Sequence, residues 1–557
     1  MKMSKIAGVD QPRSTRSAQR TARRWQVAIF GSILLAFTML VQAQVRDFDQ
    51  PDSIETPWSV VSAAPYLPDP SFNMGQYFDD YFGGINWAYM GRKIARLPNG
   101  DVIVAGLVPT FPQHYSPPLI NLGLARYDAN GTWVSWTNPG IYGTFNNWHI
   151  HFPDNGDPTN PQNVKDVLDI QVVGNRIFVL VDHKFEGTAD TDVVIHVFGT
   201  DGAFIGSTIV LGTAMDEYAG SMAFRSNLTL PETITVGVVA STFNGVWRPT
   251  YRSGTVNADS TITFNPIVYP NPGNYCPTNR GCILRGIAVG GRATSGAATK
   301  FYLAGARQAN IPDNNNWDFL AMAVNFDGTP VALFGGNGVT TVPFFEGGNN
   351  YNDANSIQVK TTGLIGTIHD EIYVSGFVDR QCKDGFGIAK LNENGALDNT
   401  FGKVVGGGRS GKMVVGGAIP PINGSCSDLL PFSTSNTYAN DSALADGKLA
   451  IAGFTSKFNF PACIVGQPCH EEDVDGMVAI IDTAQGDIDS FRSYPYTDTV
   501  NGPRTRHSGL SGIVESGGGT FTATGTGRYF ETATYPSKTQ FVTLRVRSDG
   551  IFANGFD

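Results

Sequence analysis

IYVSGFVDRQCKDGFGIAKLNENGALDNTFG, residues 372–402, is one copy of the unit from which most of this chain is built. It contains a short apolar run ending in a small residue, then a loop, a second apolar run and an Asn-Gly turn. Asx-Gly next to extended runs is a strong local signal of a β-hairpin, because Asn, Asp and Gly tolerate positive φ. The stretch therefore predicts antiparallel strands joined by tight turns.

The unit recurs seven times, with successive copies 59 to 77 residues apart. The first run reads VIVAG (102–106), IFVLV (177–181), VGVVA (236–240), FYLAG (301–305), IYVSG (372–376), LAIAG (449–453) and FTATG (521–525). The second run reads NLGLARYD (121–128), DVVIHVFG (192–199), TYRSGTVN (250–257), DFLAMAVN (318–325), DGFGIAKL (384–391), DGMVAIID (475–482) and TQFVTLRV (539–546). Such self-similarity determines the architecture, because each unit must bury its apolar face against its neighbours.

Two weaker strands accompany each pair of runs, for example GRKIARLP (91–98) before the first run and TITF (261–264) after the turn. Four strands per unit and seven units predict an all-β fold, a seven-bladed β-propeller of four-stranded antiparallel blades. Runs such as VIVAG, rich in small and branched residues, are expected to form the inner strands of the ring. The alternative is an irregular pair of β-sandwiches whose similarity arose by chance.

Residues 372–402 also resemble the delta-60 repeat of exported bacterial proteins. That repeat runs from an apolar strand ending in Gly, through an Ala-Arg/Lys-Leu strand, to Asn/Asp-Gly and Leu-Asp-x-x-Phe-Gly, which Leu397, Asp398, Phe401 and Gly402 match. The segment DPSFNMG (69–75) is similar to the tail of one further unit. The resemblance implies an exported β-propeller with an N-terminal strand completing the last blade, and it supplies no catalytic residues.

The N-terminus has the features of an export signal. Residues 1–24 contain seven basic residues and one acidic residue. An apolar stretch from Val27 to Val41 follows and ends in Val41-Gln42-Ala43, with small residues where a signal peptidase cleaves. This pattern predicts a signal peptide, residues 1–43, with an uncleaved membrane anchor as the alternative. We expect export in a Gram-negative bacterium, to the periplasm, the cell surface or the exterior.

The predicted organisation is therefore a signal peptide, then residues 44–83 as an extension with a clasp strand, then a single propeller domain, 84–557. The expected blades are at about 84–140, 160–215, 216–270, 281–345, 350–415, 428–500 and 505–557. The C-terminal IFANGFD (551–557) is similar to a sorting or processing tag of exported proteins; it is equally the last strand of the seventh blade.

Without residues 1–43 the chain has 32 basic and 48 acidic residues. A surface this acidic repels phosphate backbones and anionic lipids. We therefore expect the mature chain neither to bind nucleic acid nor to insert into a membrane. The oligomeric state is not indicated by the sequence.

Six cysteines favour disulfides, since export leads to an oxidising compartment. Cys276 and Cys282 form one closely spaced pair, and Cys463 and Cys469 form another, which leaves Cys382 with Cys426. Zinc is the alternative, but structural zinc usually has tighter Cys spacing.

Few residues suggest chemistry. His149 and His151 have the i, i+2 spacing of a metal-binding pair, or they are an exposed loop pair, and no third ligand is identifiable. Two acidic stretches, 471–475 and 313–318, are calcium candidates or solvated turns, and they lack the order of a calcium loop. No nucleotide, serine-hydrolase or zinc-protease motif is present. We therefore assign no catalytic residue, no metal and no cofactor.

Two classes of function remain open. One is a non-catalytic binding or interaction scaffold of the bacterial envelope or exterior, which contacts a protein or glycan through blade loops. The other is an extracellular glycan hydrolase or lyase, or a quinone-dependent oxidoreductase, with its active site in the axial channel. His, Arg, Asp or Glu facing the axis would favour the enzyme. Because VIVAG, FYLAG and LAIAG are apolar, the sequence favours binding, with enzymatic activity left uncertain.

Overall fold

The computed structural model describes a large part of the chain, namely residues 66–69, 71–72, 78–80, 89–109, 120–140, 149–151, 163–185, 190–227, 233–271, 276, 281–292, 298–308, 316–344, 351–363, 368–380, 383–405, 408–415, 435–457, 472–494, 506–529 and 538–548. All of them belong to one compact unit, Thr56–Ile419 with Leu429–Asp557. The predicted signal peptide and the C-terminal 551–557 lie outside the described residues.

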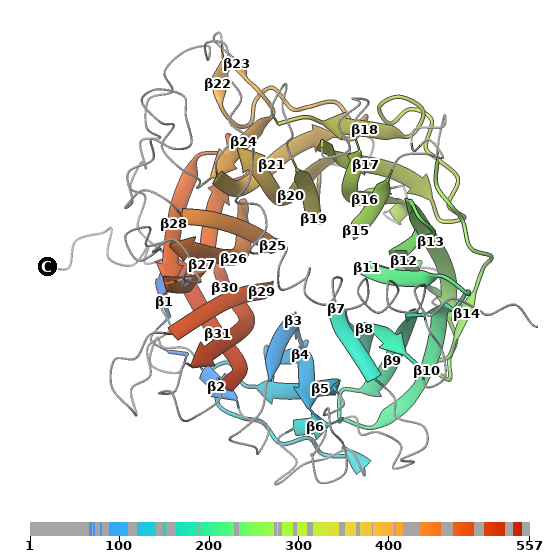
Figure 1. The fold of residues 1–557 in the computed structure, drawn as a ribbon, viewed down its shortest axis with the longest axis vertical. Coiled ribbons are helices and arrows are strands. Elements are labelled where there is room, and N and C mark those ends of the chain that lie inside the picture. The colour runs from blue at the N-terminus through green and yellow to red at the C-terminus, as the bar shows by residue number, and fades with distance from the viewer. Residues whose placement is uncertain are drawn as a thin grey trace, which may run out of the picture. The chain divides into compact units, whose positions relative to one another are not determined.

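The described residues form strands and no helix, and the strands make seven antiparallel sheets in a ring (Figure 1). The first blade consists of β3 (Met90–Arg96), β4 (Val102–Pro109), β5 (Ile120–Tyr127) and β6 (His149–His151). The second consists of β7 (Asn163–Val173), β8 (Arg176–Lys184), β9 (Asp192–Gly199) and β10 (Phe204–Leu211). The third consists of β11 (Asp216–Asn227), β12 (Thr233–Phe243), β13 (Trp247–Val256) and β14 (Ile262–Phe264).

The fourth blade consists of β15 (Cys282–Arg292), β16 (Ala298–Gln308), β17 (Trp317–Asn325) and β18 (Val339–Val342). The fifth consists of β19 (Asn352–Thr362), β20 (His369–Arg380), β21 (Lys383–Asn392) and β24 (Lys412–Val415), with a small hairpin of β22 (Val404–Val405) and β23 (Gly408–Arg409). The sixth consists of β25 (Ser435–Ala445), β26 (Lys448–Lys457), β27 (Glu472–Asp482) and β28 (Ile488–Tyr494). The seventh contains β29 (Arg506–Gly517), β30 (Thr520–Tyr529) and β31 (Lys538–Ser548), joined by β1 (Tyr66–Pro68) and β2 (Phe78–Asp80).

This architecture confirms the predicted seven-bladed β-propeller of four-stranded antiparallel blades. One expectation is wrong. The runs VIVAG to FTATG form the second strand of each blade, and the weaker strand before each run is the innermost one. In the first blade, the fourth strand lies at His149–His151, beyond the boundary expected at residue 140.

Seven apolar clusters hold the ring together, one between each pair of adjacent blades. Their residues come from both faces of each sheet, so the middle strands are buried on two sides. All eight residues of β9 are buried, for example, whereas the outer strand β10 alternates between exposed and half-buried positions before its buried end. This two-sided burial explains why the middle strands read as nearly continuous apolar runs.

Each innermost strand also carries an extra residue near its start, a β-bulge at an equivalent position in every blade, and β7 and β29 have a second register shift, at Lys165 and Ser516. The bulged residues are Arg92, Leu168, Gly220, Arg285, Asn355, Asn440 and Ser511. Opposite the bulge lies the last residue of each VIVAG-like run, which is Gly in five blades, Ala240 in the third and Val181 in the second. A Cβ on Gly106, Gly305, Gly376, Gly453 or Gly525 would lie 1.8–2.1 Å from a carbonyl oxygen of the innermost strand. The glycine signature of the repeat therefore follows from this close approach of two backbones.

The N-terminal segment supplies the outer strand of the seventh blade. β1 and β2 pair with β31, near the other end of the described chain. Asp69 accepts hydrogen bonds from the main chain and hydroxyl of Ser71. In the fifth blade, Asp398 holds Thr400 in the same way. Asp69, Ser71 and Phe72 thus make the same local hydrogen bonds as Asp398, Thr400 and Phe401 in the Leu-Asp-x-x-Phe-Gly tail of the fifth blade, but at the opposite end of the sequence.

The tail is locked by the cationic residue of the Ala-Arg/Lys-Leu strand. In the fifth blade, Lys390 lies 3.0 Å from Asp398 and is only 4% exposed. In the seventh, Arg545 lies 3.9 Å from Asp69 and 4.6 Å from the ring centre of Phe72, which is buried. The two halves of the repeat motif therefore contact each other directly.

Candidate functional site

The two ends of the ring differ in their connections. At one end, which we call the turn side, short turns such as 174–175 and 446–447 join the first strand of a blade to the second. At the other end, the loop side, longer connections such as 152–162, 416–434 and 458–471 lead into the innermost strand or join the second strand to the third. Because the bulges lie near the start of the innermost strands, they ring the axis at the loop side.

The bulged residues of three blades each hold the next blade by its main chain. Asn355 donates to the carbonyl of Ala439 and Asn440 donates to that of Leu510, each at 2.7 Å. The hydroxyl of Ser511 donates to the carbonyl of Gly91 at 2.9 Å. Each acceptor is the residue just before the bulge of the next blade. These side chains therefore join the fifth, sixth, seventh and first blades in sequence.

Two bulged arginines bind carboxylates instead. The Nε of Arg92 lies 3.0 Å from Asp166, and the Nε of Arg285 lies 3.0 Å from Asp353. Both carboxylates stand two residues before the bulge of the next blade. Arg285 is 44% exposed, whereas Asp353 is buried, so the guanidinium faces solvent around the axis.

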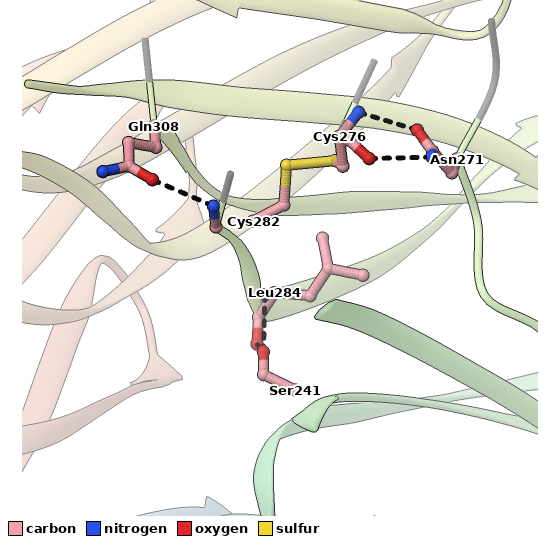
Figure 2. The surroundings of a disulfide bond; sticks show 7 residues. Ser241, Asn271, Cys276, Cys282, Leu284 and Gln308 are labelled. Atoms are coloured by element: carbon pink, nitrogen blue, oxygen red, sulfur yellow. Dashed lines mark hydrogen bonds between the residues drawn. A yellow bond between two sulfur atoms is a disulfide. The ribbon is translucent and has the colours of Figure 1, made fainter. Parts of the chain in front are cut away.

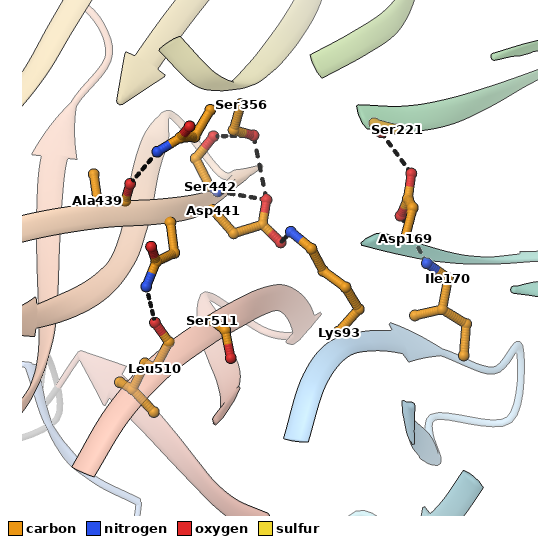
Figure 3. A network of polar contacts seen from close by, with 12 residues as sticks. Lys93, Asp169, Ile170, Ser221, Ser356, Ala439, Asp441, Ser442, Leu510 and Ser511 are labelled. Atoms are coloured by element: carbon orange, nitrogen blue, oxygen red, sulfur yellow. Dashed lines mark hydrogen bonds and ion pairs between the residues drawn. The ribbon is translucent and has the colours of Figure 1, made fainter. Parts of the chain in front are cut away.

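The residues just after the bulges form a second polar ring, part of which appears in Figure 3. The ammonium of Lys93 lies 3.0 Å from Asp441, and Ser356 hydrogen-bonds to both Asp441 and Ser442. Gly512 occupies the equivalent position of the seventh blade, and a Cβ there would lie 3.0 Å from the Cα of Lys93. A side chain at residue 512 would thus crowd the first blade beside this ion pair.

Asp169 completes this ring in the second blade. One of its oxygens accepts from the hydroxyl of Ser221 at 2.5 Å and from the main-chain N–H of Met222 at 2.9 Å. Burial raises the pKa of Asp169, and the nearby Lys93 opposes that shift only in part. The other oxygen accepts from the main-chain N–H of Ile170 and from Gln171 in its own strand. The carboxyl is therefore buried with both oxygens engaged, which makes it a poor candidate for proton transfer to a ligand.

These contacts overturn the expectation that apolar strands line the axis. The innermost strands are polar: Arg92, Lys93, Asp169, Arg285 and Asp441 all lie on them. The bulge hides them in the sequence, because an extra residue breaks the alternation by which a strand is recognised. Each charge is nevertheless paired or hydrogen-bonded to another blade. Chemically, the axial groups are arranged to hold blades together.

The other sequence candidates are placed as follows. His149 is a buried residue of β6 with its ring 6.1 Å from that of Trp133, so the exposed-loop interpretation is wrong for it; the side chain of His151 is outside the described residues. In the acidic stretches, Asp475 is buried in β27, and Asp318 lies in β17 with a pKa raised by burial.

Within the ranges that the structure describes, no three His, Cys, Asp or Glu residues are placed to hold a metal ion. Over the same ranges, no helix is long and apolar enough to span a membrane.

One predicted disulfide is confirmed, between Cys276 and Cys282 (Figure 2). Asn271 brackets it by accepting from the N–H of Cys276 and donating to its carbonyl. The bond ties the connection between the third and fourth blades to the start of β15, at the loop side. Cys382, Cys426, Cys463 and Cys469 lie outside the described residues.

No protein-family model matches this chain, and no curated protein matches its sequence. Solved structures give weak matches. A mutant of Synechocystis apocarotenoid oxygenase is 10% identical, with a TM-score of 0.31, over 57% of this chain and 62% of the enzyme. The propeller domain of the Trilobed protease from Pyrococcus furiosus is 10% identical (TM-score 0.34; 81% and 93% covered). A mutant NanB sialidase from Streptococcus pneumoniae is 11% identical (TM-score 0.32; 84% and 70% covered). The chain thus spans less than two thirds of the oxygenase's length, and these likenesses say nothing about its activity.

Proposed function

We propose that this chain is an exported binding scaffold, a β-propeller of the bacterial envelope or exterior that engages its partner at the loop side without catalysing a reaction. The observation that supports the proposal is that the charged side chains around the axis are paired with one another. Lys93 is paired with Asp441, Arg92 with Asp166 and Arg285 with Asp353. A catalytic group must be held ready for substrate, whereas these groups already bind one another across blades.

Export is supported by the Cys276–Cys282 disulfide, because such bonds persist in oxidising compartments. Kinship with delta-60 repeat proteins is part of the same proposal. It is supported by the contact between Lys390 and Asp398, which joins the two most specific elements of that repeat.

The proposal is tested by photocrosslinking from the two ends of the ring. A benzophenone amino acid replaces Phe243, exposed at the loop side, or Leu333, exposed near the turn side. In envelope fractions of the native host, we expect one saturable adduct from position 243, competed away by unlabelled protein, and none from position 333. Equal labelling from both positions would contradict a loop-side binding face.

The enzyme alternative is tested in parallel. Purified protein is incubated with panels of glycans and with quinone-linked electron acceptors, and products are followed by mass spectrometry and dye reduction. We expect no turnover. Turnover that Asp441→Asn abolishes, in a variant that remains folded, would place an active site on the axis and overturn the proposal.

A further inference from the structure

Aromatic side chains gather at the loop side of the third to sixth blades. Neighbouring ring centres lie 4.7–6.1 Å apart in two groups. The first group is Tyr218, Phe243 and Trp247, and the second is Trp317, Tyr351, Phe377, Tyr438 and Phe454. We call these eight residues the aromatic arc. None of them is fully buried, and Tyr218, Phe243 and Tyr351 are exposed.

The two groups meet at Gly281, beside the disulfide. A Cβ on Gly281 would lie 2.6 Å from the ring of Trp317 and 3.5 Å from the Cβ of Trp247. The main-chain N–H of Gly281 donates to Gln308, and Cys282 follows directly in β15 (Figure 2). The glycine lets the chain pass between two tryptophans, and the disulfide fixes that passage. The aromatic arc is therefore continuous across the junction of the third and fourth blades.

Arg285 stands within the aromatic arc. It lies in the fourth blade, binds Asp353 of the fifth, and interacts with the phenol of Tyr351. Asp353 uses its Nε and the phenol of Tyr351 a further donor, and the remaining N–H groups of the 44% exposed side chain can donate to a ligand. The carboxylate of Asp353 is itself buried, so it holds the guanidinium in place and is enclosed by the protein. Hydrogen-bond donors thus adjoin exposed aromatic surface.

The charges at this mouth cancel. Arg285 is balanced by Asp353, Lys93 by Asp441 and Arg92 by Asp166, so none of these three cations is left unpaired for an anion. What remains is apolar ring surface together with paired hydrogen-bonding groups. A saccharide has matching chemistry, since its C–H groups pack on aromatic rings and each hydroxyl both donates and accepts.

We propose that the aromatic arc with Arg285 binds an uncharged oligosaccharide. The proposal rests on the binding function proposed above and names its ligand class. Tyr351 and Trp317 supply apolar contact, and the guanidinium of Arg285 binds adjacent hydroxyls. An ionic polysaccharide is the competing ligand, distinguished by salt dependence, because the affinity of a neutral ligand is nearly independent of ionic strength.

The test is affinity electrophoresis of the purified protein in native gels. The gels contain neutral polysaccharides (laminarin, galactomannan, hydroxyethyl cellulose, dextran) or anionic ones (alginate, polygalacturonate). We expect at least one neutral polysaccharide to retard the protein, unchanged from 0.05 to 0.5 M NaCl. Trp317→Ala and Tyr351→Ala should weaken binding by about tenfold each. Arg285→Lys keeps the charge but loses the planar fork, and it should weaken binding too. Thermal unfolding of each variant shows that it is folded.

Leu333→Ala is the matched control, because it removes an 83% exposed apolar side chain away from the aromatic arc; its affinity should equal that of the wild type. The proposal is overturned if no neutral polysaccharide retards the protein, or if all variants are retarded equally. It is also overturned if only anionic polysaccharides retard the protein and salt abolishes that retardation. Crosslinking from position 243 without glycan binding would leave the binding scaffold standing and reject this ligand. Release of new reducing ends from a polysaccharide would support the glycan ligand but would reject the non-catalytic scaffold.

Discussion

The ammonium of Lys93 in the first blade contacts the carboxylate of Asp441 in the sixth at 3.0 Å, although 348 residues separate them. The pair reaches past the seventh blade, which carries only Gly512 at the equivalent position. Contacts on the axis therefore tie together blades that are not neighbours. Loss of such an axial contact should therefore lower the free energy of unfolding of the ring.

Lys93→Met should lower the free energy of unfolding by about 1–3 kcal/mol, because the side chain of Asp441 is only 20% exposed and loses its partner. Thermal unfolding measures the loss. Asp487→Asn is the control, since Asp487 pairs with Arg409 but is 53% exposed; it should cost less than about 1 kcal/mol. Equal effects of the two substitutions would contradict an axial role for Lys93.

Gly453→Ala should destabilise the sixth blade by about 1–3 kcal/mol or prevent soluble expression, because the new Cβ would meet the carbonyl oxygen of Tyr438 at 1.8 Å. Gly206→Ala serves as the control. Its Cβ would have no atom within 4 Å in the outer strand β10, so the melting temperature should stay near that of the wild type. A tolerated Gly453→Ala would show that the bulge does not require glycine.

The N-terminal clasp should be essential to closure. A chain beginning at residue 66 keeps β1 and β2, and should unfold near the wild-type temperature. A chain beginning at residue 81 loses both strands and the buried Phe72, and should melt well below it. Phe72→Ala in the complete chain should cost about 3–5 kcal/mol. Indistinguishable melting of the two truncated chains would contradict closure by this segment.

Acid should destabilise the second blade through two histidines. Burial lowers the pKa of His183 to about 4 and that of His196 to about 3. An unfolded histidine takes up a proton near pH 6.5, so the unfolded state binds more protons below that pH. The stability that these residues contribute is complete above pH 6.5 and is lost as the pH falls towards 4 and then 3.

His196→Gln and His183→Asn should therefore flatten the dependence of the melting temperature on pH between 6.5 and 4. Buried Asp169 and Asp182 act in the opposite sense. Burial raises their pKa values, so their contribution is lost as the pH rises through those values. Comparing each variant with the wild type isolates the histidine effect. Parallel profiles would show that neither histidine is kept neutral by the fold.

Removal of the disulfide, as Cys276→Ser with Cys282→Ser, should cost about 2 kcal/mol, the value for a small closed loop. If the bond also positions Trp247 and Trp317 through Gly281, the same variant should bind polysaccharide more weakly than its stability loss alone would cause. Affinity electrophoresis well below the melting temperature separates the two effects. Unchanged retardation would limit the bond to a stabilising role.

The sequence predicts the ring correctly because its two middle strands are buried on both faces. Runs such as FYLAG and DFLAMAVN are continuous apolar segments followed by tight turns, and each becomes a strand of the fourth blade. The innermost strands are less visible. A bulge at Arg285 or Asn355 shifts the alternation by one residue, so apolar and polar positions no longer alternate along the strand.

The candidate site could not be predicted for a related reason. Phe377 and Tyr438 stack with ring centres 5.0 Å apart, yet they belong to different blades and to different positions of the repeat. Nothing in either local sequence indicates the other. Such contacts depend on how far successive blades rotate about the axis, which the period of the repeat does not specify.

The pairing of β1 with β31 also bears on how the molecule comes apart. A linear array of repeats frays from its terminal units, because each of those has only one neighbour. Tyr66 opposite Ser548 removes both free ends at once, and every blade then has two neighbours. We expect unfolding to begin with the release of β1 and β2 from β31, so the lifetime of the protein among proteases should be governed by how often this clasp opens rather than by the average stability of its blades.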